Sequence, residues 1–443
     1  MSRLRNCFGT LAVTTAVLLL IAGFFSFDLL PASHAFERLA PSTDWPQWRG
    51  PNRDGISTET GFLADWKEAP TLLWKKSELG RGYASVAVVG DTLYTAGKVK
   101  EISYGYALNE ADGSVKWSVP IGEPKDENPR ATPTVDGDRV YFLGAEGALL
   151  CVDRATGKPI WSKDFAADFG GKMMSGWKFC ESPLIDGDRL VCTPGGKEAL
   201  VVCLNKLTGE TIWKSPLPDV GRSGKDGAGY SSIVISNAAG VKQYVQIIGR
   251  GCIGIAADDG RFLWAYNRVA NQTANIPTPI IDGDFVFCST GYGTGAALLK
   301  LSKEGSGVKA EEQYFLPGKE LQNHHGGMIK IGDYVYMGHG HNRGYPTCVE
   351  MKTGKIVWRQ ENDIPGTGSA AIVFAEGKLY FRYQNGVVAL IDAKPEGYGF
   401  HGQLQIPDAG NDSWPHPVVC HGKLFLREHD TLYVYDIARK DGQ

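Results

Sequence analysis

Charge is sparse and evenly spread in this 443-residue sequence, whose net charge is −3 at pH 7. It contains no long charge run and no low-complexity tract, and neither sign is concentrated in one half. A nucleic-acid-binding surface needs a basic patch that neutralises phosphates, so nucleic acid is not an expected partner. Hydrophobic residues make up 43% and aromatic residues 11% of the chain, enough for a packed core. Scattered glycine and proline favour one large all-β domain.

Motifs of common enzyme classes are also missing. The chain has no GxSxG elbow, no HExxH, no P-loop and no CxxCH haem site. The glycine-rich GYGTGA around Tyr292 follows a strand pattern, but it leads into another strand rather than a helix. A dinucleotide-binding loop is therefore not predicted there, although residues assembled across loops would escape this search.

The cysteines give little indication of a disulfide framework. Five of them stand inside apolar strand patterns, where free cysteine behaves as a small buried hydrophobe: Cys151, Cys192, Cys203, Cys288 and Cys348. Cys192 and Cys203 lie on neighbouring strands of one predicted hairpin. They form the one pair for which a disulfide is worth testing.

The N-terminus resembles a secretory signal. Arg3 and Arg5 precede an apolar stretch from about Leu11 to Phe27, and Ser33-His34-Ala35 supplies small residues before a cleavage point. We expect residues 1–35 to be a signal peptide, the alternative being an uncleaved N-terminal anchor that would be the only membrane contact. The context of Cys7 does not fit a lipoprotein cleavage site. The mature chain is therefore expected in the periplasm or an equivalent envelope space.

An internal repeat dominates the rest of the sequence. Clear copies begin at Ala131 (ATPTVDGDRVYFLGAEGALLCVDRATGKPIW) and at Glu181 (ESPLIDGDRLVCTPGGKEALVVCLNKLTGETIW), and a partial copy begins at Pro277. Each copy shows a strand, a DG turn, a strand, a loop, a strand, a TG turn and a strand that carries tryptophan. This pattern predicts four short antiparallel strands per unit.

The spacing of the fourth-strand tryptophans gives the number of units. They are Trp74, Trp117, Trp161, Trp213, Trp264 and Trp358, with gaps of 43, 44, 52, 51 and 94 residues. The last gap equals two units, and Tyr314 is the expected substitute. The strand around Trp74 has no first three strands before it, and the last copy has no fourth strand. We predict an eight-bladed β-propeller of four-stranded antiparallel blades, residues 71–443, whose N-terminal strand completes the last blade. These tryptophans are expected to dock neighbouring blades.

The repeat signature resembles a known family. VDRATGKPIW and LNKLTGETIW are similar to the repeats of the PQQ-like, quinoprotein-type β-propeller family, which includes quinoprotein dehydrogenases and the outer-membrane assembly propeller lipoprotein. The segments DWPQWRGPNRDGIS, KQYVQIIGRGCIGI and NHHGGMIKIGDYVYMG more specifically resemble secreted PQQ-binding-like propellers of planctomycete-type bacteria, over nearly all of residues 44–440. This resemblance implies the fold but no settled activity. Residues 36–70 are expected to form an extended lead-in that covers the outer rim or one face.

Nearly all unusual residues fall in one set of connections. The A–B and C–D turns of the blades are short and uniform, whereas the D–A and B–C connections, which share the other face, are varied. Loops on a rigid scaffold are where binding residues concentrate, so this face is the expected ligand-binding site. Its candidate residues are Tyr83, Trp177, Tyr230, Arg250, Asn275, Tyr292, His324, His325, His339, His341, Arg382 and Trp414.

The histidines among these candidates permit three interpretations. They could brace glycine-rich loops by hydrogen bonding, contact a ligand directly, or bind a metal, for which His339 and His341 have the two-residue spacing of one strand face. We predict no metal site. A further histidine, His416, precedes the last blade.

The cofactor that the resemblance implies is PQQ. Quinoprotein dehydrogenases of this fold add vicinal cysteines, a Ca²⁺ site with acidic and Asn ligands, and an Asp base. This sequence has no Cys-Cys pair, and we expect no acidic oxygen cluster on the candidate face. Arg250 or Arg382 together with Trp177 could bind a planar anionic quinone, which keeps a quinoprotein-like oxidoreductase as one alternative.

The sequence therefore favours a non-catalytic, exported, monomeric propeller. Its expected partner is an envelope protein or a small ligand, bound on the loop-rich face, and no cofactor is expected. The alternatives are a PQQ-dependent oxidoreductase and an outer-membrane assembly scaffold.

Overall fold

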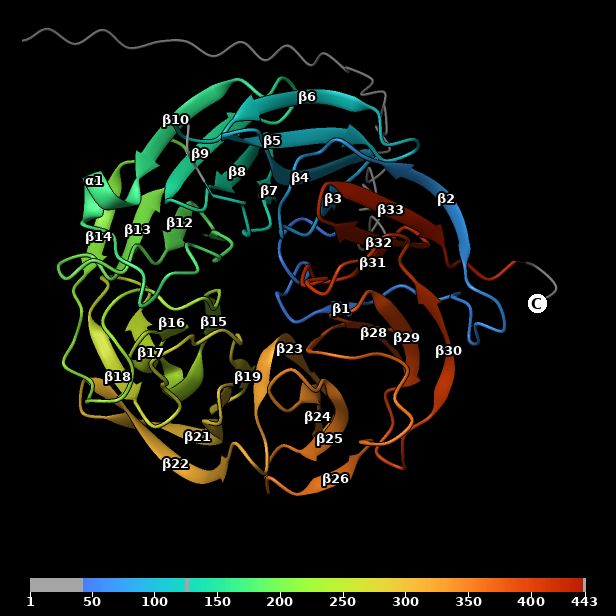
Figure 1. Cartoon of the computed structure of the whole chain (residues 1–443). Coiled ribbons are helices and arrows are strands. Elements are labelled where there is room, and N and C mark those ends of the chain that lie inside the picture. Colours follow the sequence, from blue (N-terminus) through green and yellow to red (C-terminus); the bar gives the residue numbers. More distant parts are fainter. Residues whose placement is uncertain (1–42, 124–126, 441–443) are drawn as a thin grey trace, which may run out of the picture. The chain divides into compact units, whose positions relative to one another are not determined.

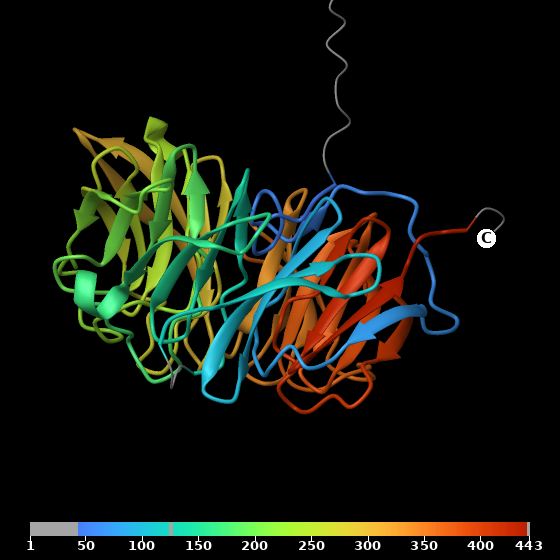
Figure 2. The ribbon, with the colours of Figure 1, turned by 90° about the horizontal axis from the view of Figure 1, so that it is seen from above.

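The computed structural model describes residues 43–123 and 127–440. Within these ranges eight sheets surround a central axis, each built on four antiparallel strands and one of them extended by a fifth (Figure 1). Figure 2 shows the same sheets from the edge. The predicted eight-bladed all-β propeller is confirmed. The predicted signal segment, residues 1–35, lies outside the described residues. No helix within the described ranges is long and apolar enough to span a bilayer.

Each blade places its first strand at the axis and its fourth strand at the rim. Blade 1 consists of β3 (Ala87–Val89), β4 (Thr92–Val99), β5 (Ile102–Asn109) and β6 (Val115–Pro120). Blade 2 consists of β7 (Thr134–Asp136), β8 (Arg139–Leu143), β9 (Ala148–Asp153) and β10 (Pro159–Asp164). Blade 3 consists of β11 (Leu184–Asp186), β12 (Arg189–Cys192), β13 (Val201–Asn205) and β14 (Thr211–Ser215). Blade 4 consists of β15 (Val234–Ser236), β16 (Gln243–Ile248), β17 (Gly251–Ala256) and β18 (Phe262–Tyr266).

The second half of the ring repeats this order. Blade 5 consists of β19 (Ile280–Asp282), β20 (Phe285–Thr290), β21 (Gly295–Glu304) and β22 (Gly307–Pro317). Blade 6 consists of β23 (Asn323–Ile331), β24 (Tyr334–His339), β25 (Tyr345–Glu350) and β26 (Ile356–Arg359). Blade 7 consists of β27 (Ala370–Ala375), β28 (Lys378–Tyr383), β29 (Val387–Asp392) and β30 (Phe400–Gln405), and blade 8 of β31 (Val418–Cys420), β32 (Lys423–Glu428), β33 (Thr431–Asp436) and β2 (Thr71–Lys76). Two short helices, α1 (Phe165–Phe169) and η1 (Ala238–Gly240), lie between strands.

The ring closes through β2, as the sequence predicts. This strand pairs antiparallel with β33, so Trp74 lies opposite Val434 and β2 completes the last blade. A second contact joins the two ends of the fold, because β1 (Ile56–Ser57) adds a fifth strand to blade 7 by pairing parallel with β27. Closure leaves no blade without two neighbours, which removes the open faces that an incomplete ring would expose.

Blades contact each other through the fourth-strand tryptophans. The indole Nε1 of Trp117 donates to the carbonyl of Arg154 in the next blade at 3.0 Å, and its ring covers Gly157 of that blade's TG turn. Gly157 has φ +71°, and a Cβ there would lie 2.7 Å from the indole. Glycine is therefore needed for two reasons: the positive φ of the backbone and the close packing of the tryptophan ring. Trp74, Trp161, Trp213 and Trp358 donate to carbonyls of the following blade in the same way.

Three blades depart from this arrangement. Blade 7 has Gln403 at this position, opposite Ala389. Tyr314 takes the tryptophan position in blade 5, and its hydroxyl donates to the carbonyl of Met351 at 2.6 Å. Trp264 faces the β21–β22 hairpin, which is longer than the usual third and fourth strands and has no TG turn. Its indole donates to Oε1 of Gln243 in its own blade instead.

The lead-in before β2 runs through the axis rather than over the rim alone. Trp45 pairs with Val88 of β3, and the carbonyl of Pro46 accepts from Val135 of β7. On the other side of the axis, Gly55 bonds to Phe374 of β27. The chain then passes outward, where Phe62 and Trp66 form bridges to residues 438 and 402, and reaches β2 at the rim. In Figure 1 this blue segment enters the middle of the ring.

All eight cysteines within the described residues are free thiols. Cys192 and Cys203 cannot form the disulfide considered above, because Val202 lies opposite Cys192 and Cys203 lies opposite Val191. The two side chains therefore project from opposite faces of the sheet, into different core clusters. Two pairs of fully buried thiols share a core cluster across a blade boundary, Cys151 with Cys192 and Cys252 with Cys288.

The docking of tryptophan on glycine leads to a stability prediction. Gly157→Ala should lower the free energy of unfolding by about 1–3 kcal/mol more than Gly187→Ala, because only Gly157 lies against an indole. Gly187 is a matched control, since its φ of +59° is similar and a Cβ there meets nothing within 4 Å. The backbone conformation alone should cost each variant roughly 1–2 kcal/mol. Urea unfolding monitored by tryptophan fluorescence measures both, and equal losses would contradict the docking role.

Candidate functional site

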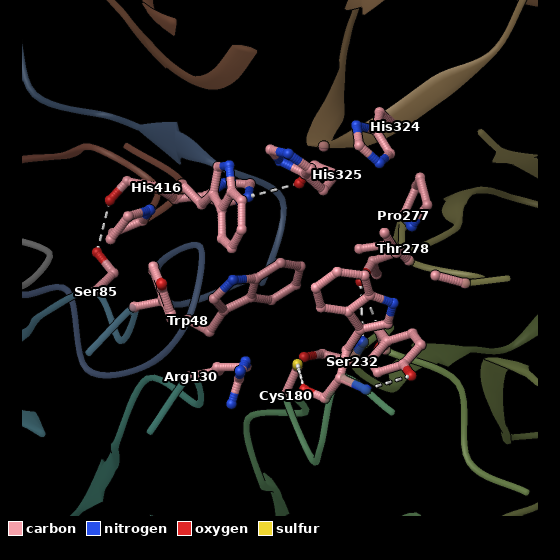
Figure 3. Close-up of a pocket in the computed structure, with 18 of the residues that line it drawn as sticks. Trp48, Ser85, Arg130, Cys180, Ser232, Pro277, Thr278, His324, His325 and His416 are labelled. Atoms are coloured by element: carbon pink, nitrogen blue, oxygen red, sulfur yellow. Dashed lines mark hydrogen bonds between the residues drawn. The ribbon is translucent and has the colours of Figure 1, made fainter. Parts of the chain in front are cut away.

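A cavity of about 340 Å³ opens on the loop-rich face at the ring axis. Its walls come from residues just before the first strands of the blades and from B–C connections. Eight of the twelve candidate residues line it: Tyr83, Trp177, Tyr230, Tyr292, His324, His325, His341 and Trp414. Figure 3 shows several of the lining side chains pointing toward a common space. Most residues that the sequence assigns to the loop-rich face therefore line one cavity.

The lead-in forms the floor of this cavity. Trp48 lines it, while the guanidinium groups of Arg49 and Arg53 lie 5.5 and 5.8 Å from the Trp48 ring and do not line it. Arg49 donates to the carbonyl of Met328 in blade 6, and Arg53 donates to the carbonyl of Ser182 beside blade 3 at 2.7 Å. These bonds anchor the lead-in to opposite sides of the axis. A separate cavity of about 580 Å³ lies beyond it, lined by lead-in residues and by the ends of the first strands nearest the A–B turns.

A belt of side-chain hydroxyls joins blades 1 to 5 just below the cavity. The backbone N–H at this position of each blade donates to the hydroxyl of the next, in the order Ser85, Thr132, Ser182, Ser232 and Thr278, with distances of 3.0–3.3 Å. Blade 6 has Gly327 at the equivalent position. Its missing side chain leaves the space that the Arg49 guanidinium occupies, since a Cβ there would lie 2.2 Å from Nη1. The belt is therefore replaced by the lead-in on that side.

Aromatic rings make up much of the wall. Tyr83 and Trp414 stack with ring centroids 4.9 Å apart, and the guanidinium of Arg130 lies 5.6 Å from the Tyr83 ring. Trp177 stands at the rim and is 50% exposed. Its backbone N–H donates to the hydroxyl of Tyr230 at 3.2 Å, which holds the long connection before β11 over the opening. An exposed indole at the edge of an aromatic cavity is a typical ligand-contact position.

The histidines form a compact group in blade 6. The ring of His324 lies 4.4 Å from that of His325 and 4.2 Å from that of His341. Both His324 ring nitrogens are paired, Nδ1 with the Ser369 hydroxyl at 2.6 Å and Nε2 with the Tyr292 hydroxyl at 3.1 Å. His324 is therefore a bracing residue that also reaches the cavity wall.

Burial keeps these imidazoles neutral. Removal from water lowers the pKa of His324 to about 2 and the pKa values of His325 and His416 to about 3, because the charged form loses hydration. Neighbouring histidines lower the pKa of His324 and His325 further. At neutral pH each ring therefore presents one donor and one acceptor rather than a positive charge.

Backbone strain also gathers at the cavity. Tyr292 and Asn342 have φ values of +55° and +53°, a region that side chains other than glycine rarely adopt. Both residues line the cavity, and Lys178, with φ +65°, follows Trp177 at its rim. Such conformations cost of order 1–3 kcal/mol and concentrate at binding and catalytic sites.

Four candidate residues lie away from the cavity and hold loops together. Arg250 pairs with Asp226 at 2.7 Å, and Asn275, fully buried, donates to the carbonyls of residues 248 and 249. His339 accepts from the backbone N–H of residue 322 at 3.2 Å. Arg382, also fully buried, pairs with Glu428 at 2.6 Å. The two arginines considered for a quinone are thus already neutralised elsewhere.

Two carboxylates and a histidine also lie close together on this face. Asp412, Glu428 and His429 bring their ligand atoms within 4.8 Å of one another beside Tyr83. They come from two connections of blade 8 that are separated in sequence. Arg81 pairs with Asp412 and Arg382 pairs with Glu428, so the group is a network of ion pairs in which positive and negative side chains balance.

Several lining residues escaped the sequence analysis. Trp48 stands in a segment assigned to the rim or one face. Arg130 and Cys180 stand in connections before first strands, and Cys180 follows the candidate Trp177 by three residues. The belt hydroxyls left a weak signal, since Thr132, Ser182 and Thr278 each precede a proline at the same place in the repeat. His416, noted in the sequence, also lines the cavity.

The closed ring, the docked tryptophans and the axial cavity define a PQQ-like β-propeller. The chain belongs to the family described as outer membrane protein assembly factor BamB, whose model matches residues 67–143 and 104–360. BamB of Shewanella oneidensis is 24% identical over 263 residues, covering 56% of this chain and 61% of that protein. 1-Butanol dehydrogenase (quinone) of Thauera butanivorans is 29% identical over 163 residues, covering 34% of this chain and 26% of that enzyme.

Solved structures show the same fold at low identity. BamB from Moraxella catarrhalis superposes with a TM-score of 0.59 at 14% identity, covering 85% of this chain and all of that one. Quinohemoprotein alcohol dehydrogenase from Comamonas testosteroni gives 0.62 at 14% identity, covering 90% and 81%. These likenesses establish architecture, and they leave open what this cavity binds.

The neutral histidines predict a pH-dependent stability. An unfolded imidazole has a pKa of about 6.5. Because the folded pKa of His324 is about 2, the unfolded chain binds more protons below about pH 6.5. The free energy of unfolding should be fully retained above that pH and fall as the pH drops toward 3. For His324 alone the loss at about pH 4.5 should be roughly 2–3 kcal/mol. Urea unfolding across this range measures it, and His324→Gln should flatten the dependence. An unchanged pH dependence in that variant would show that the ring is not held neutral.

Proposed function

We propose that this protein is a binding protein of the cell envelope that takes a small organic ligand in the axial cavity. The observation that carries the proposal is the aromatic cavity, which is closed below by Trp48 and whose volume of about 340 Å³ lies within the range of small-molecule sites, roughly 300–1,000 Å³. Membership of a family described by outer membrane assembly supports an envelope location, as does the signal-like N-terminal sequence.

The acid–base properties of the cavity favour binding over catalysis. A general base works best with a pKa near the operating pH, and burial lowers the pKa of His325 and of His416 to about 3. Burial also raises the pKa of the Cys180 thiol to about 12, which leaves it without thiolate character. The histidines that line the cavity are neutral. Among the described lining residues Arg130 is the one charged side chain, and none is a carboxylate.

The residues present do not fit PQQ. This cofactor is a planar quinone with three carboxylates, and Arg130 is the single permanent cation lining the cavity within the described ranges. Arg250 and Arg382 are held by Asp226 and Glu428. The carboxylates of Asp412 and Glu428 are paired with Arg81 and Arg382. We therefore assign no step to a quinone.

Trp177 provides a direct test of the proposed site. Trp177→Ala should weaken ligand binding about tenfold, because an aromatic contact contributes about 0.5–1.5 kcal/mol beyond its buried area. A fragment library screened by thermal shift gives the ligand, and fluorescence titration gives the affinity. Phe400→Ala is the matched control, since Phe400 is 48% exposed on an outer strand and Trp177 is 50% exposed at the cavity. Equal affinities in the two variants would place binding elsewhere.

A second candidate function is that of an assembly scaffold, favoured by the family match and by the outer strands. These strands carry an unpaired edge and exposed apolar side chains, including Leu72, Leu73, Val115, Ile160, Ile212, Phe262 and Phe400, each 41–48% exposed. Such edges can pair with a partner strand.

The scaffold function predicts an edge-specific contact. Crosslinking of the exported chain in envelope preparations should give products that map to β2 or another outer strand. Leu73→Lys should remove those mapping to β2 by charging the edge, while Trp177→Ala leaves them in place. Products confined to the loop-rich face, or insensitive to the edge charge, would contradict the scaffold function.

A further inference from the structure

Unpaired polar atoms collect on one wall of the axial cavity. Six buried nitrogen or oxygen atoms on five lining residues have no hydrogen-bond partner among the described residues: His325 Nδ1 and Nε2, His341 Nδ1, His416 Nδ1, Trp414 Nε1 and Gln384 Oε1. All five residues belong to blades 6 to 8. This is the side on which the hydroxyl belt is missing. Each buried polar atom left unpaired costs about 1–3 kcal/mol. Because these atoms are buried, a ligand gains that free energy when the side chain turns its polar edge toward the cavity.

The mixture of these groups restricts the chemistry of the ligand. The indole of Trp414 can only donate, the amide oxygen of Gln384 can only accept, and each neutral imidazole does one of each. Carbonyls and carboxylates only accept, and ammonium groups only donate. Hydroxyl groups do both. A ligand that satisfies this wall must therefore carry both donors and acceptors, which several hydroxyls on one molecule supply. Half a turn of an imidazole about its Cβ–Cγ bond brings its nitrogens to the other edge of the ring.

The rest of the cavity suits the faces of a ring. Trp48 forms the floor, Trp177 the rim, and the Tyr83–Trp414 pair one side. The apolar C–H faces of a sugar ring stack on such indoles, whereas its edge carries the hydroxyls. The aromatic side chains therefore suit the apolar faces of a sugar ring, and the polar wall suits the hydroxyls at its edge.

The electrostatics exclude a cationic ligand. Arg49 and Arg53 lie behind Trp48 without lining the cavity, and Arg130 stands beside Tyr83. A cation above Trp48 would be repelled by both buried guanidinium groups, so the aromatic cage is unsuited to a quaternary ammonium group. One cationic side chain on the wall permits at most a single negative charge on the ligand.

We infer that the ligand of this cavity is a carbohydrate unit, either neutral or carrying one carboxylate, that stacks on the tryptophans and pairs its hydroxyls with the blade 6 to 8 wall. This inference rests on the proposed function and adds the class of ligand. Neutral sugars and uronic acids share the ring and hydroxyl chemistry, and Arg130 distinguishes them.

Fluorescence titration of the mature chain tests the inference. The probes are neutral hexoses and disaccharides, glucuronate, and three compounds of other classes: PQQ, benzoate and choline. We expect a sugar to bind and the non-sugars to fail. His325→Phe keeps the ring shape but removes both nitrogens, and should weaken binding about tenfold, the equivalent of one hydrogen bond of about 1.4 kcal/mol. His401→Phe, on outer strand β30, is the matched control and should bind normally.

Arg130→Gln separates the two kinds of sugar. It should weaken glucuronate binding about tenfold and leave neutral sugars unchanged. Circular dichroism and the unfolding midpoint confirm that each variant is folded. Sugar binding that is the same in His325→Phe and in the unmodified chain would overturn the inference. Binding of a non-sugar probe alone would overturn it while leaving the proposed function in place. If every probe fails to bind and the fragment screen proposed above also finds no ligand, both the inference and the proposed function are overturned.

Discussion

Pairing of β2 with β33 is the interaction on which the rest of this molecule depends. Eight blades can each bury two faces only if the ring is closed, and closure here uses a strand from the N-terminal side of the first blade. Without it, blade 8 would end in a three-stranded sheet with an open edge. In the closed ring every described blade has two neighbours. Most outer strands dock on the next blade through a tryptophan or Tyr314, and blade 7, with Gln403 at this position, is the exception.

Closure also determines where the lead-in can lie. The segment that precedes β2 must reach the rim of blade 8, and it does so from the axis, through β1 and the bridges of Phe62 and Trp66. Trp48 is thereby placed at the centre of the ring, with Arg49 and Arg53 bonded to carbonyls on opposite sides. A channel that would otherwise run through the propeller becomes two separate cavities, and the one on the loop-rich face acquires an aromatic floor.

The two walls of that cavity differ for a structural reason. Blades 1 to 5 use hydroxyls at the start of their first strands to bond to one another, which satisfies the backbone at the axis. Blades 6 to 8 have Gly327, Ala371 and His416 at this position, and the lead-in takes the place of the belt. Polar atoms of His325, Trp414 and Gln384 on this side are buried without a hydrogen-bond partner among the described residues.

The sequence alone determined the repeat, the blade number and the closing strand, because these depend on local patterns: DG and TG turns, β-branched runs and regularly spaced tryptophans. It also determined which connections share a face, since that follows from strand alternation. Only the tertiary structure decided which residues meet. Arg382 and Arg250 have the same local character as Arg130, yet Glu428 and Asp226 hold the first two away from the cavity. Trp48 reaches the axis through contacts with blades far away in sequence. Such pairings depend on how eight blades are arranged around one axis. No local sequence pattern encodes which residues from distant blades come into contact.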